Sequence, residues 1–261
     1  MHNSELTERD FWENWWEEWS LPLEKRKSKQ DRYQNEILRV FDSYLPKDSK
    51  LSILEIGGAP GQYLAYMRKN FGYEVSCLDY TNVGYLKTKE NFDLLHISGH
   101  VYQADLFSEE LSLPQFDIVY SLGFIEHFSD LNMVIEKHLR LLKPGGILLI
   151  GTPNFLGINH FLAKRLTPEL LSVHNLAAMD TRNWASFEDA FGLEVLFKGY
   201  VGGFEPRVFW RCENRNLQNW VLRAILYALS LSYSSHSRIL RRVNGRRTSG
   251  FAIGVYRKPT F

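Results

Sequence analysis

Short apolar runs alternate with segments of helical periodicity along most of the chain after residue 50. The apolar runs predict strands at 51–56, 73–78, 99–103, 116–121 and 146–151, and two later strands at 193–200 and 250–257. Helical patterns lie between them at 61–70, 83–95 and 130–142. This alternation predicts an α/β fold, with a seven-stranded, mostly parallel sheet and helices on both faces.

The segment 130–142 has the clearest helical pattern. Ser129 or Asp130 can cap its start, and the sequence "KPGG" is expected to end it. Its apolar face carries Leu131, Val134, Ile135, His138, Leu139 and Leu142. Because His138 falls on that face, we expect it to pack in the core or at its boundary and not to take part in function.

Three segments decorate this predicted sheet. Residues 1–45 have the pattern of two helices and are expected to form an N-terminal cover or lid, which leaves 46–261 as the main domain. A polar, aromatic-bearing insertion occupies 153–183. A second, helical insertion at 205–248 separates the last two strands.

In sheets of this kind ligands bind beyond the carboxyl ends of the strands, and a glycine-rich loop follows the first one. The stretch "LSILEIGGAPGQYLAYM" places Gly57, Gly58, Ala59 and Gly61 there. A dinucleotide fingerprint needs free N–H groups for a pyrophosphate, but its third glycine is missing and Pro60 has no N–H. Glu55 would repel a phosphate and suits a cation. The loop therefore favours a sulfonium cofactor over a phosphate-bearing one.

Polar residues also follow the next strands. Asp79, with Tyr80 beside it, ends the second strand, where a carboxylate can accept hydrogen bonds from both hydroxyls of a ribose. Sites for NAD use the same device, so Asp79 alone leaves the cofactor open. Asp105 and Leu106 follow the third strand and suit an adenine ring. After the fourth strand, Ser121 and Leu122 are expected beneath the cofactor.

Five motifs in this order and spacing resemble the class I S-adenosylmethionine-dependent methyltransferases. They are "LEIGGAPG", "LDY", "ADLF", "FDIVYSLGFIEH" and "LLKPGGILLI", and the resemblance covers about residues 50–152 and, less sharply, the last two strands. The "EH" after the fourth strand is similar to small-molecule methyltransferases of the quinone-modifying kind. The loop departs from the family pattern at Ala59 and Pro60, where glycine is more usual.

This resemblance implies methyl transfer from S-adenosylmethionine to oxygen or nitrogen of a small molecule, leaving S-adenosylhomocysteine. Glu55 and the 57–61 loop would hold the methionine portion, Asp79 the ribose, and Asp105 with Leu106 the adenine. Three alternatives stay open: an NAD-dependent reductase, a membrane-associated lipid or quinone methyltransferase, and a non-catalytic binding module that keeps the fold.

Candidate groups for the acceptor follow the fourth and fifth strands. His127 could act as the base for a hydroxyl acceptor, because its ordinary pKa lies near neutral pH, or could only pack against the next helix. Glu126, Asn154, His160 and His174 are candidate substrate contacts. The spacing of Glu126 and the histidines matches no compact metal-ligand motif, so we expect no metal.

Four tryptophans near the N-terminus recur at helical spacing in "RDFWENWWEEWS". Trp12, Trp15, Trp16 and Trp19 share one helical face. They either pack the helix onto the domain or form a lid over an apolar pocket. Under the second interpretation Trp16 and Trp19 would contact the substrate.

Charge is distributed unevenly. The net charge is +1, but residues 205–261 contain 11 Lys or Arg and 2 Asp or Glu, so the first 204 residues carry about −8. An acidic body argues against general nucleic-acid binding. The apolar and basic segment 217–247 could contact a membrane surface or form a homodimer. With two cysteines, Cys77 and Cys212, and no signal-peptide pattern, we expect a cytoplasmic protein.

Overall fold

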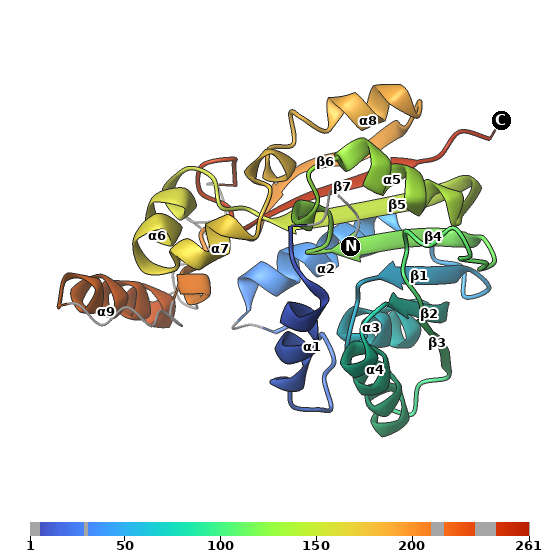
Figure 1. The fold of residues 1–261 in the computed structure, drawn as a ribbon, viewed down its shortest axis with the longest axis horizontal. Helices are drawn as coiled ribbons and strands as arrows, with labels where there is room; N and C mark the ends of the chain where they lie inside the picture. Colours follow the sequence, from blue (N-terminus) through green and yellow to red (C-terminus); the bar gives the residue numbers. More distant parts are fainter. Residues whose placement is uncertain (1–5, 29–30, 210–216, 233–243, 261) are drawn as a thin grey trace.

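The computed structural model describes residues 6–28, 31–209, 217–232 and 244–260. Its centre is one sheet of seven strands in the order β3-β2-β1-β4-β5-β7-β6 (Figure 1). The pairs among β1 to β5 are parallel, and β7 runs antiparallel to both β5 and β6. The seven predicted strands are confirmed as β1 (Ser52–Ile56), β2 (Glu74–Asp79), β3 (Gly99–Gln103), β4 (Phe116–Leu122), β5 (Leu142–Pro153), β6 (Glu194–Val201) and β7 (Phe251–Arg257).

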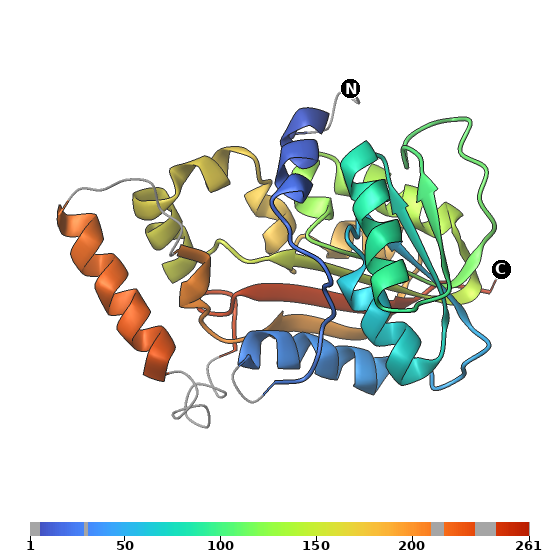
Figure 2. The same ribbon diagram turned by 90° about the horizontal axis from the view of Figure 1, so that it is seen from below.

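Helices cover both faces of this sheet (Figure 2). One face is covered by α2 (Arg32–Tyr44), α3 (Gln62–Phe71) and α4 (Asn82–Leu94), and the other by α5 (Leu131–Arg140) and α8 (Ala185–Ala190). Neighbouring residues of a strand alternate between the two hydrophobic clusters: Ile53 packs in the first and Leu54 in the second. The continuous apolar runs at β1 and β4 therefore reflect strands that are buried on both sides.

The predicted helix 130–142 is shorter than its apolar pattern. Asp130 is the N-cap, and its side chain accepts a hydrogen bond from the backbone N–H of Met133 at 3.1 Å. The helix ends at Arg140, before the "KPGG" sequence, and Leu142 belongs to β5, where it pairs with Phe116 of β4. Leu142 is buried because of the sheet and not because it continues the helical face.

The predicted N-terminal cover consists of two helices with different roles. Helix α1 (Arg9–Glu17) contains no buried residue, whereas α2 buries Ile37, Leu38 and Phe41 in the core. The prediction that 1–45 forms one cover is therefore corrected. Helix α2 belongs to the layer on the sheet, and only α1 lies over the ends of the strands (Figure 2).

Both predicted insertions are helical. Helices α6 (Ile158–Leu166) and α7 (Pro168–Ser172) and the 3₁₀ turn η2 (Leu176–Met179) follow β5, while η3 (Pro206–Phe209) and α9 (Leu217–Ser232) lie between β6 and β7. Helix α9 lies at the end of the molecule, beyond α6 and α7 (Figure 1). Within the described ranges, none of the helices combines the length and apolar composition that crossing a membrane requires.

Candidate active site

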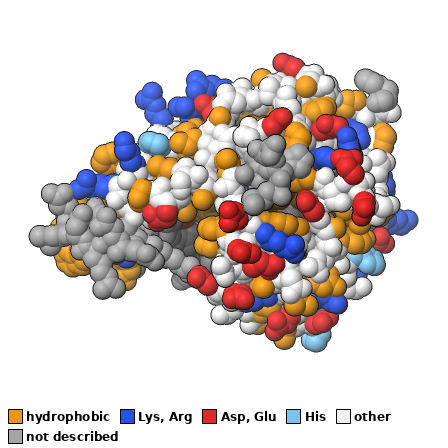
Figure 3. Space-filling view, in the orientation of Figure 1, with side chains coloured by type: hydrophobic (Ala, Val, Ile, Leu, Met, Phe, Trp, Pro, Cys, Tyr) orange, Lys and Arg blue, Asp and Glu red, His pale blue; other side chains and the backbone are white. Residues whose placement is uncertain are grey.

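A cavity of about 690 Å³ opens at the carboxyl ends of β1, β2 and β4. It lies where the strand order reverses between β1 and β4, as expected for an open α/β sheet. Its size is within the range of ligand pockets, about 300–1,000 Å³. On the face that carries α1, acidic side chains are interspersed with hydrophobic ones (Figure 3).

Strand β1 and the loop after it bring Glu55 and two glycines to one end of this cavity. Gly57 has φ of +64° and donates its N–H to the carbonyl of Leu78 at 2.8 Å, which ties the loop to β2. The Glu55 side chain lies directly against Gly58: a Cβ atom on Gly58 would come within 2.1 Å of Glu55 Cγ. Glycine at this position is therefore required for Glu55 to face the cavity.

Glu55 is an almost fully buried acid, with 3% of its surface exposed. Burial raises its pKa to about 8, helped by the charge of Asp79, while the Tyr120 hydroxyl and the charge of Lys25 oppose the shift. Among the described residues, no hydrogen-bond donor satisfies Glu55 Oε2. A buried, unsatisfied carboxyl oxygen beside a cavity fits a ligand that brings a cationic group with N–H donors.

Asp79 ends β2 and faces the same end of the cavity. Thr81 holds its Oδ1 atom in place, because both its backbone N–H (2.9 Å) and its hydroxyl (2.6 Å) donate to it. Burial raises the pKa of Asp79, although these hydrogen bonds favour the ionised form. A fixed carboxyl group at the end of the second strand suits a ligand diol, as predicted.

Further along the strand ends, Asp105, Leu106 and Phe107 line the cavity, as do Tyr80 and Leu122. Asp105 Oδ1 accepts a hydrogen bond from the backbone N–H of Phe107 at 2.8 Å, so this carboxylate also closes its own turn. Asp105, Leu106 and Leu122 therefore line the same cavity as Glu55 and Asp79, and their contacts with the cofactor stay predictions.

Two predicted cofactor contacts do not line the cavity. Ser121 is completely buried on the opposite side of β4, where its hydroxyl is 3.0 Å from His138 Nε2 in α5. Gly61 instead forms the N-cap of α3 with φ of +76°, and a Cβ atom there would come within 2.7 Å of the Phe92 ring. Ser121 and Gly61 are therefore structural, which corrects the prediction. The same contact confirms that His138 is a core residue.

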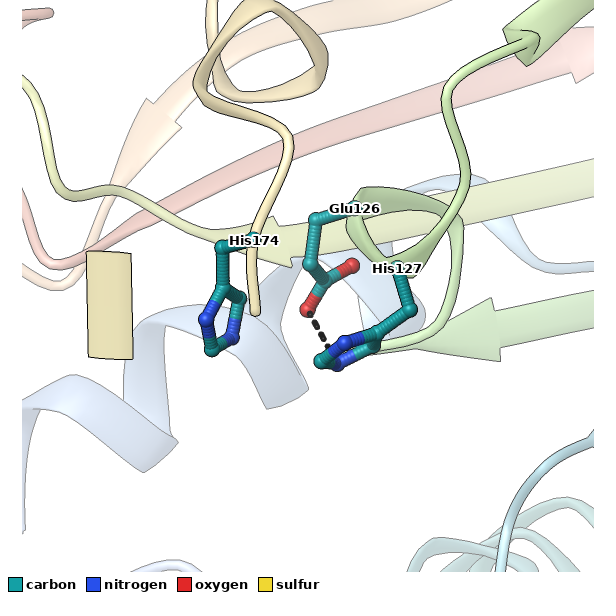
Figure 4. A group of neighbouring side chains, drawn as sticks. All are labelled: Glu126, His127 and His174. Carbon is teal, nitrogen blue, oxygen red and sulfur yellow. Dashed lines mark ion pairs between the residues drawn. The ribbon is translucent and has the colours of Figure 1, made fainter. Parts of the chain in front are cut away.

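The other end of the cavity contains Glu126, His127 and His174. One ligand atom from each side chain lies within 4.8 Å of the other two (Figure 4), and the centroids of the two imidazole rings are 4.6 Å apart. Burial lowers the pKa of His127 to about 3, with a further contribution from His174, and raises that of Glu126 to about 8. Sequence separation hid this cluster, because His174 lies 47 residues after His127.

Two segments of the chain hold the turn that carries Glu126 and His127. The backbone N–H of Leu6 donates to the carbonyl of His127 at 2.8 Å, and that of Asn175 donates to the carbonyl of Glu126 at 2.6 Å. The Asn175 side chain adds a hydrogen bond to the carbonyl of Phe128 at 2.8 Å. The turn η1 (Ile125–His127) is therefore held from both sides, which keeps its polar side chains facing the cavity.

Two predicted substrate contacts lie outside the cavity. Asn154 is buried, and its side-chain N–H groups donate to the carbonyls of Arg246 (3.0 Å) and Ser249 (2.7 Å). It therefore joins two loops. His160 lies in α6, half-buried and away from the lining residues. The prediction that Asn154 and His160 contact substrate is thus corrected.

The tryptophan stripe covers the cavity. Trp12, Trp15, Trp16 and Trp19 all line it, and the Trp12 ring meets His127 edge-on at 4.7 Å between centroids. Trp16 stacks on Trp12 at 6.2 Å and lies 5.7 Å from Trp19. The tryptophans of α1 therefore reach a cavity instead of a packed core, which agrees with the lid interpretation.

Polar contacts hold α1 in this position. The Glu13 carboxylate accepts from the backbone N–H groups of Asn82 (2.9 Å) and Val83 (2.8 Å) at the start of α4, and Arg9 donates to the carbonyl of Tyr80 at 2.6 Å. Burial alone would raise the pKa of Glu13, but these hydrogen bonds and Arg9 lower it. An acid at a helix N-terminus is also favoured by the helix dipole.

Several lining residues escaped the sequence analysis. They come from turns and from the first residues of helices: Gln62, Tyr63, Phe128, Thr167, Glu169 and Leu170. Only Gln62 and Tyr63 carried a signal, because they directly follow the glycine loop.

The end of the cavity that contains Glu55 and Asp79 therefore fits S-adenosylmethionine. Glu55 offers an unsatisfied oxygen for an ammonium group, Gly57 and Gly58 leave the loop without side chains, and Asp79 presents a fixed carboxyl group. No lysine or arginine occurs among the cavity-lining residues of the described part of the chain. A pyrophosphate would thus meet acids and find no cation, which disfavours NAD.

Comparison with known proteins agrees with this geometry. Residues 23–200 match a family described as methyltransferase domain. The chain is 30% identical over 108 residues to a malonyl-[acyl-carrier protein] O-methyltransferase of Enterobacter lignolyticus, covering 41% of this chain and 41% of that protein. It is 26% identical over 196 residues to a glycine/sarcosine/dimethylglycine N-methyltransferase of Actinopolyspora halophila, covering 65% of this chain and 34% of that protein. Each match thus spans less than half of the relative's length.

A solved structure shares the fold. The phosphoethanolamine N-methyltransferase 2 of Haemonchus contortus, in complex with S-adenosyl-L-methionine, superimposes with a TM-score of 0.56 at 16% identity, over 85% of this chain and 52% of that chain. The family match covers more than half of the residues. The chain therefore belongs to the class I S-adenosylmethionine-dependent methyltransferases, and S-adenosylmethionine is its cofactor.

Proposed function

From this membership we propose that the chain methylates oxygen or nitrogen of a small-molecule acceptor. One observation carries the proposal: a single cavity contains Glu55 and Asp79 at one end and His127 with His174 at the other. The first end suits the cofactor, which leaves the second for the acceptor. Both ends belong to one cavity that is lined by the tryptophans of α1.

The charges of the lining residues favour a neutral or cationic acceptor. The described lining includes the acids Glu126 and Glu169 near the acceptor end, and no lysine or arginine. Aromatic side chains from α1 also line the cavity, so an acceptor with an apolar or aromatic part would bury well. An ammonium acceptor would gain cation–π contacts with the same indoles.

Bound S-adenosylmethionine supplies a methyl group already activated by its sulfonium. The residues of this chain would then need to orient the acceptor, exclude water and receive a proton. The Nδ1 atom of His127 lies 3.0 Å from the carbonyl of Val173, so it carries the hydrogen and leaves Nε2 with a free lone pair. That Nε2 would take the proton lost by a hydroxyl acceptor as the acceptor oxygen forms its new bond.

The buried polar groups argue against a non-catalytic binding module. Glu126 is 1% exposed and His127 4% exposed, and desolvation of both costs stability. Such groups gathered beside a cofactor end are typical of a reaction site. A module that only bound the cofactor would need none of them.

A membrane-associated lipid or quinone methyltransferase is the second candidate. Helix α9 exposes Trp220, Val221, Ile225 and Tyr227, an apolar group that could lie on a membrane surface or form a homodimer contact. The basic residues Arg238, Arg241 and Arg242, part of the predicted contact 217–247, lie outside the described residues. Co-sedimentation with anionic vesicles that is lost in Trp220→Ser/Ile225→Ser would support this candidate. A cytoplasmic location agrees with the buried free thiol of Cys77.

Formation of S-adenosylhomocysteine from S-adenosylmethionine tests the proposal. Matched pairs of phenols and amines, each with and without an added carboxylate, would serve as acceptors. We expect turnover of neutral or cationic members, with the carboxylated partner at least about tenfold slower, because an unpaired charge opposite buried acids is costly. If only the carboxylated acceptors were methylated, the proposal of a neutral or cationic acceptor would be refuted. Cofactor binding without turnover of any acceptor would favour the binding module.

A further inference from the structure

The two histidines of the acceptor end have the same hydrogen-bond arrangement. His127 Nδ1 faces the carbonyl of Val173, and His174 Nδ1 faces the carbonyl of Leu170. A carbonyl oxygen can only accept, so both Nδ1 atoms carry hydrogen and both Nε2 atoms are bare lone pairs. A backbone carbonyl on the second ring nitrogen is the usual support of a metal-binding histidine.

The third member is the carboxyl group of Glu126, which adds oxygen atoms but no hydrogen bond to His127 Nε2. Glu126 Oε1 lies 3.9 Å from His127 Nε2, which is too long for a hydrogen bond. Glu126 Oε2 is buried without a hydrogen-bond partner in the described part of the chain. The three side chains therefore turn acceptors toward one another in a buried space (Figure 4). Facing acceptors need a cation or a shared proton between them.

The spacing is close to that of a metal site. Ligand atoms on a tetrahedral zinc ion lie about 3.3 Å apart, given bonds of about 2.0–2.1 Å. The three atoms here lie within 4.8 Å of one another, so closing the site requires side-chain movements of little more than an ångström. The backbone hydrogen bonds of Leu6 and Asn175 already hold the segment that carries Glu126 and His127.

We propose that Glu126, His127 and His174 bind a divalent first-row transition-metal cation, with Zn²⁺ as the reference ion. Two imidazoles and one carboxylate suit such ions better than Mg²⁺ or Ca²⁺, which prefer oxygen ligands. Three protein ligands leave a coordination position toward the cavity, as in catalytic zinc sites.

The role of this cation rests on the proposed function, but its binding does not. An acceptor hydroxyl on the open position would have its pKa lowered by the cation, as a zinc-bound water does. In the metal-bound protein the cation would thus replace His127 as the group that prepares the acceptor oxygen. This proposal departs from the sequence-based expectation of a metal-free site.

Metal binding is tested on the untagged full chain after treatment with a chelator. Calorimetric titration with Zn²⁺ is expected to show one ion per chain, and titration with Co²⁺ should give the visible absorption of a four- or five-coordinate ion. Glu126→Gln and His174→Asn should each weaken Zn²⁺ binding at least about 100-fold, because even supporting residues change metal affinity by 10–100-fold. His160→Asn, a half-buried histidine outside the cluster, is the matched control and should bind like the native chain.

Binding of S-adenosylhomocysteine, measured on the same samples, separates the two proposals. It should be retained in Glu126→Gln and His174→Asn, which also verifies that both variants are folded. No Zn²⁺ bound by a native chain that binds S-adenosylhomocysteine would overturn the metal site and leave the cofactor site intact. Zn²⁺ binding that persists in both variants would equally overturn it. Failure to bind S-adenosylhomocysteine would instead contradict the proposed function.

Discussion

The Glu55 side chain lies on the α-carbon of Gly58, where any side chain would displace it. A Cβ atom on Gly58 would come within 2.1 Å of Glu55 Cγ and 2.2 Å of its Cδ. The two residues form one unit, in which the glycine makes room for the acid that faces the cavity. For the placement of Glu55, the glycine at position 58 is therefore more important than the lack of a glycine at position 59.

Gly58→Ala should weaken S-adenosylhomocysteine binding by at least about tenfold, because the displaced Glu55 would lose a charge-assisted hydrogen bond of about 1.5–3 kcal/mol. Calorimetry measures the change directly. Gly245→Ala is the matched control, since a Cβ atom there has no neighbour within 4 Å. Equal affinities of Gly58→Ala and the native chain would show that Glu55 does not hold the ligand.

The raised pKa of Glu55 predicts a pH dependence with a definite sign. Its pKa rises from 4.5 to about 8, so the folded protein without ligand binds more protons than the unfolded chain between these values. The contribution of Glu55 to stability is then present below pH 4.5 and is lost as the pH rises through about 8.

Binding of a cationic ligand should follow the opposite trend. Affinity for S-adenosylmethionine is expected to increase from pH 6 to pH 8, with release of a proton, because the ionised carboxylate attracts the ammonium group. Titration in buffers of different ionisation enthalpy measures the released proton. Glu55→Gln should remove both trends. A native affinity that does not change over this range would contradict the assignment.

Glu13 should determine how firmly α1 covers the cavity. Glu13→Ala removes the acceptor for the backbone N–H groups of Asn82 and Val83, a loss comparable to that of a helix cap, about 1 kcal/mol. Limited proteolysis within residues 6–20 is then expected to accelerate about fivefold. Glu17→Ala, an exposed acid of the same helix, should change little. Equal cleavage rates of both variants would show that other contacts hold the helix.

Substitution of Ser121 on β4 distinguishes a structural role of this residue from a role in cofactor binding. Ser121→Ala leaves His138 Nε2 without its buried partner at 3.0 Å, so the free energy of unfolding should fall by about 1–3 kcal/mol. Affinity for S-adenosylhomocysteine should stay within about twofold, because Ser121 does not line the cavity. Chemical denaturation and calorimetry on the same variant test both statements. A large loss of affinity with unchanged stability would restore the original prediction.

The sheet and the cofactor end were accessible from the sequence because both depend on local pattern. Runs such as "ILEI" and "CLD" show buried strands, and the residues just after them must lie at the carboxyl edge of a parallel sheet. Glu55 and Asp79 follow from this rule alone. The same rule cannot tell which face of β4 a residue occupies, and this is why Ser121 was assigned to the wrong side.

The acceptor end depends on contacts between distant segments. His174 lies near Glu126 because the backbone N–H of Asn175 donates a hydrogen bond to the carbonyl of Glu126. No periodic pattern in the sequence predicts such a contact. Asn154 and His160 had equally suitable chemistry, but Asn154 is used to join loops and His160 lies outside the cavity. At the acceptor end, the residue type therefore indicates a function only once the position of the side chain in the fold is known.

The most direct test of the central claim is thermal unfolding with S-adenosylhomocysteine, with NAD as control, for the native chain and Asp79→Ala. Ligand at about 100 times its dissociation constant should stabilise the native chain by about 2.7 kcal/mol, or roughly 5–10 °C. We predict this increase with S-adenosylhomocysteine only, and its loss in Asp79→Ala. An increase with NAD instead, or no increase with either ligand, would contradict the account.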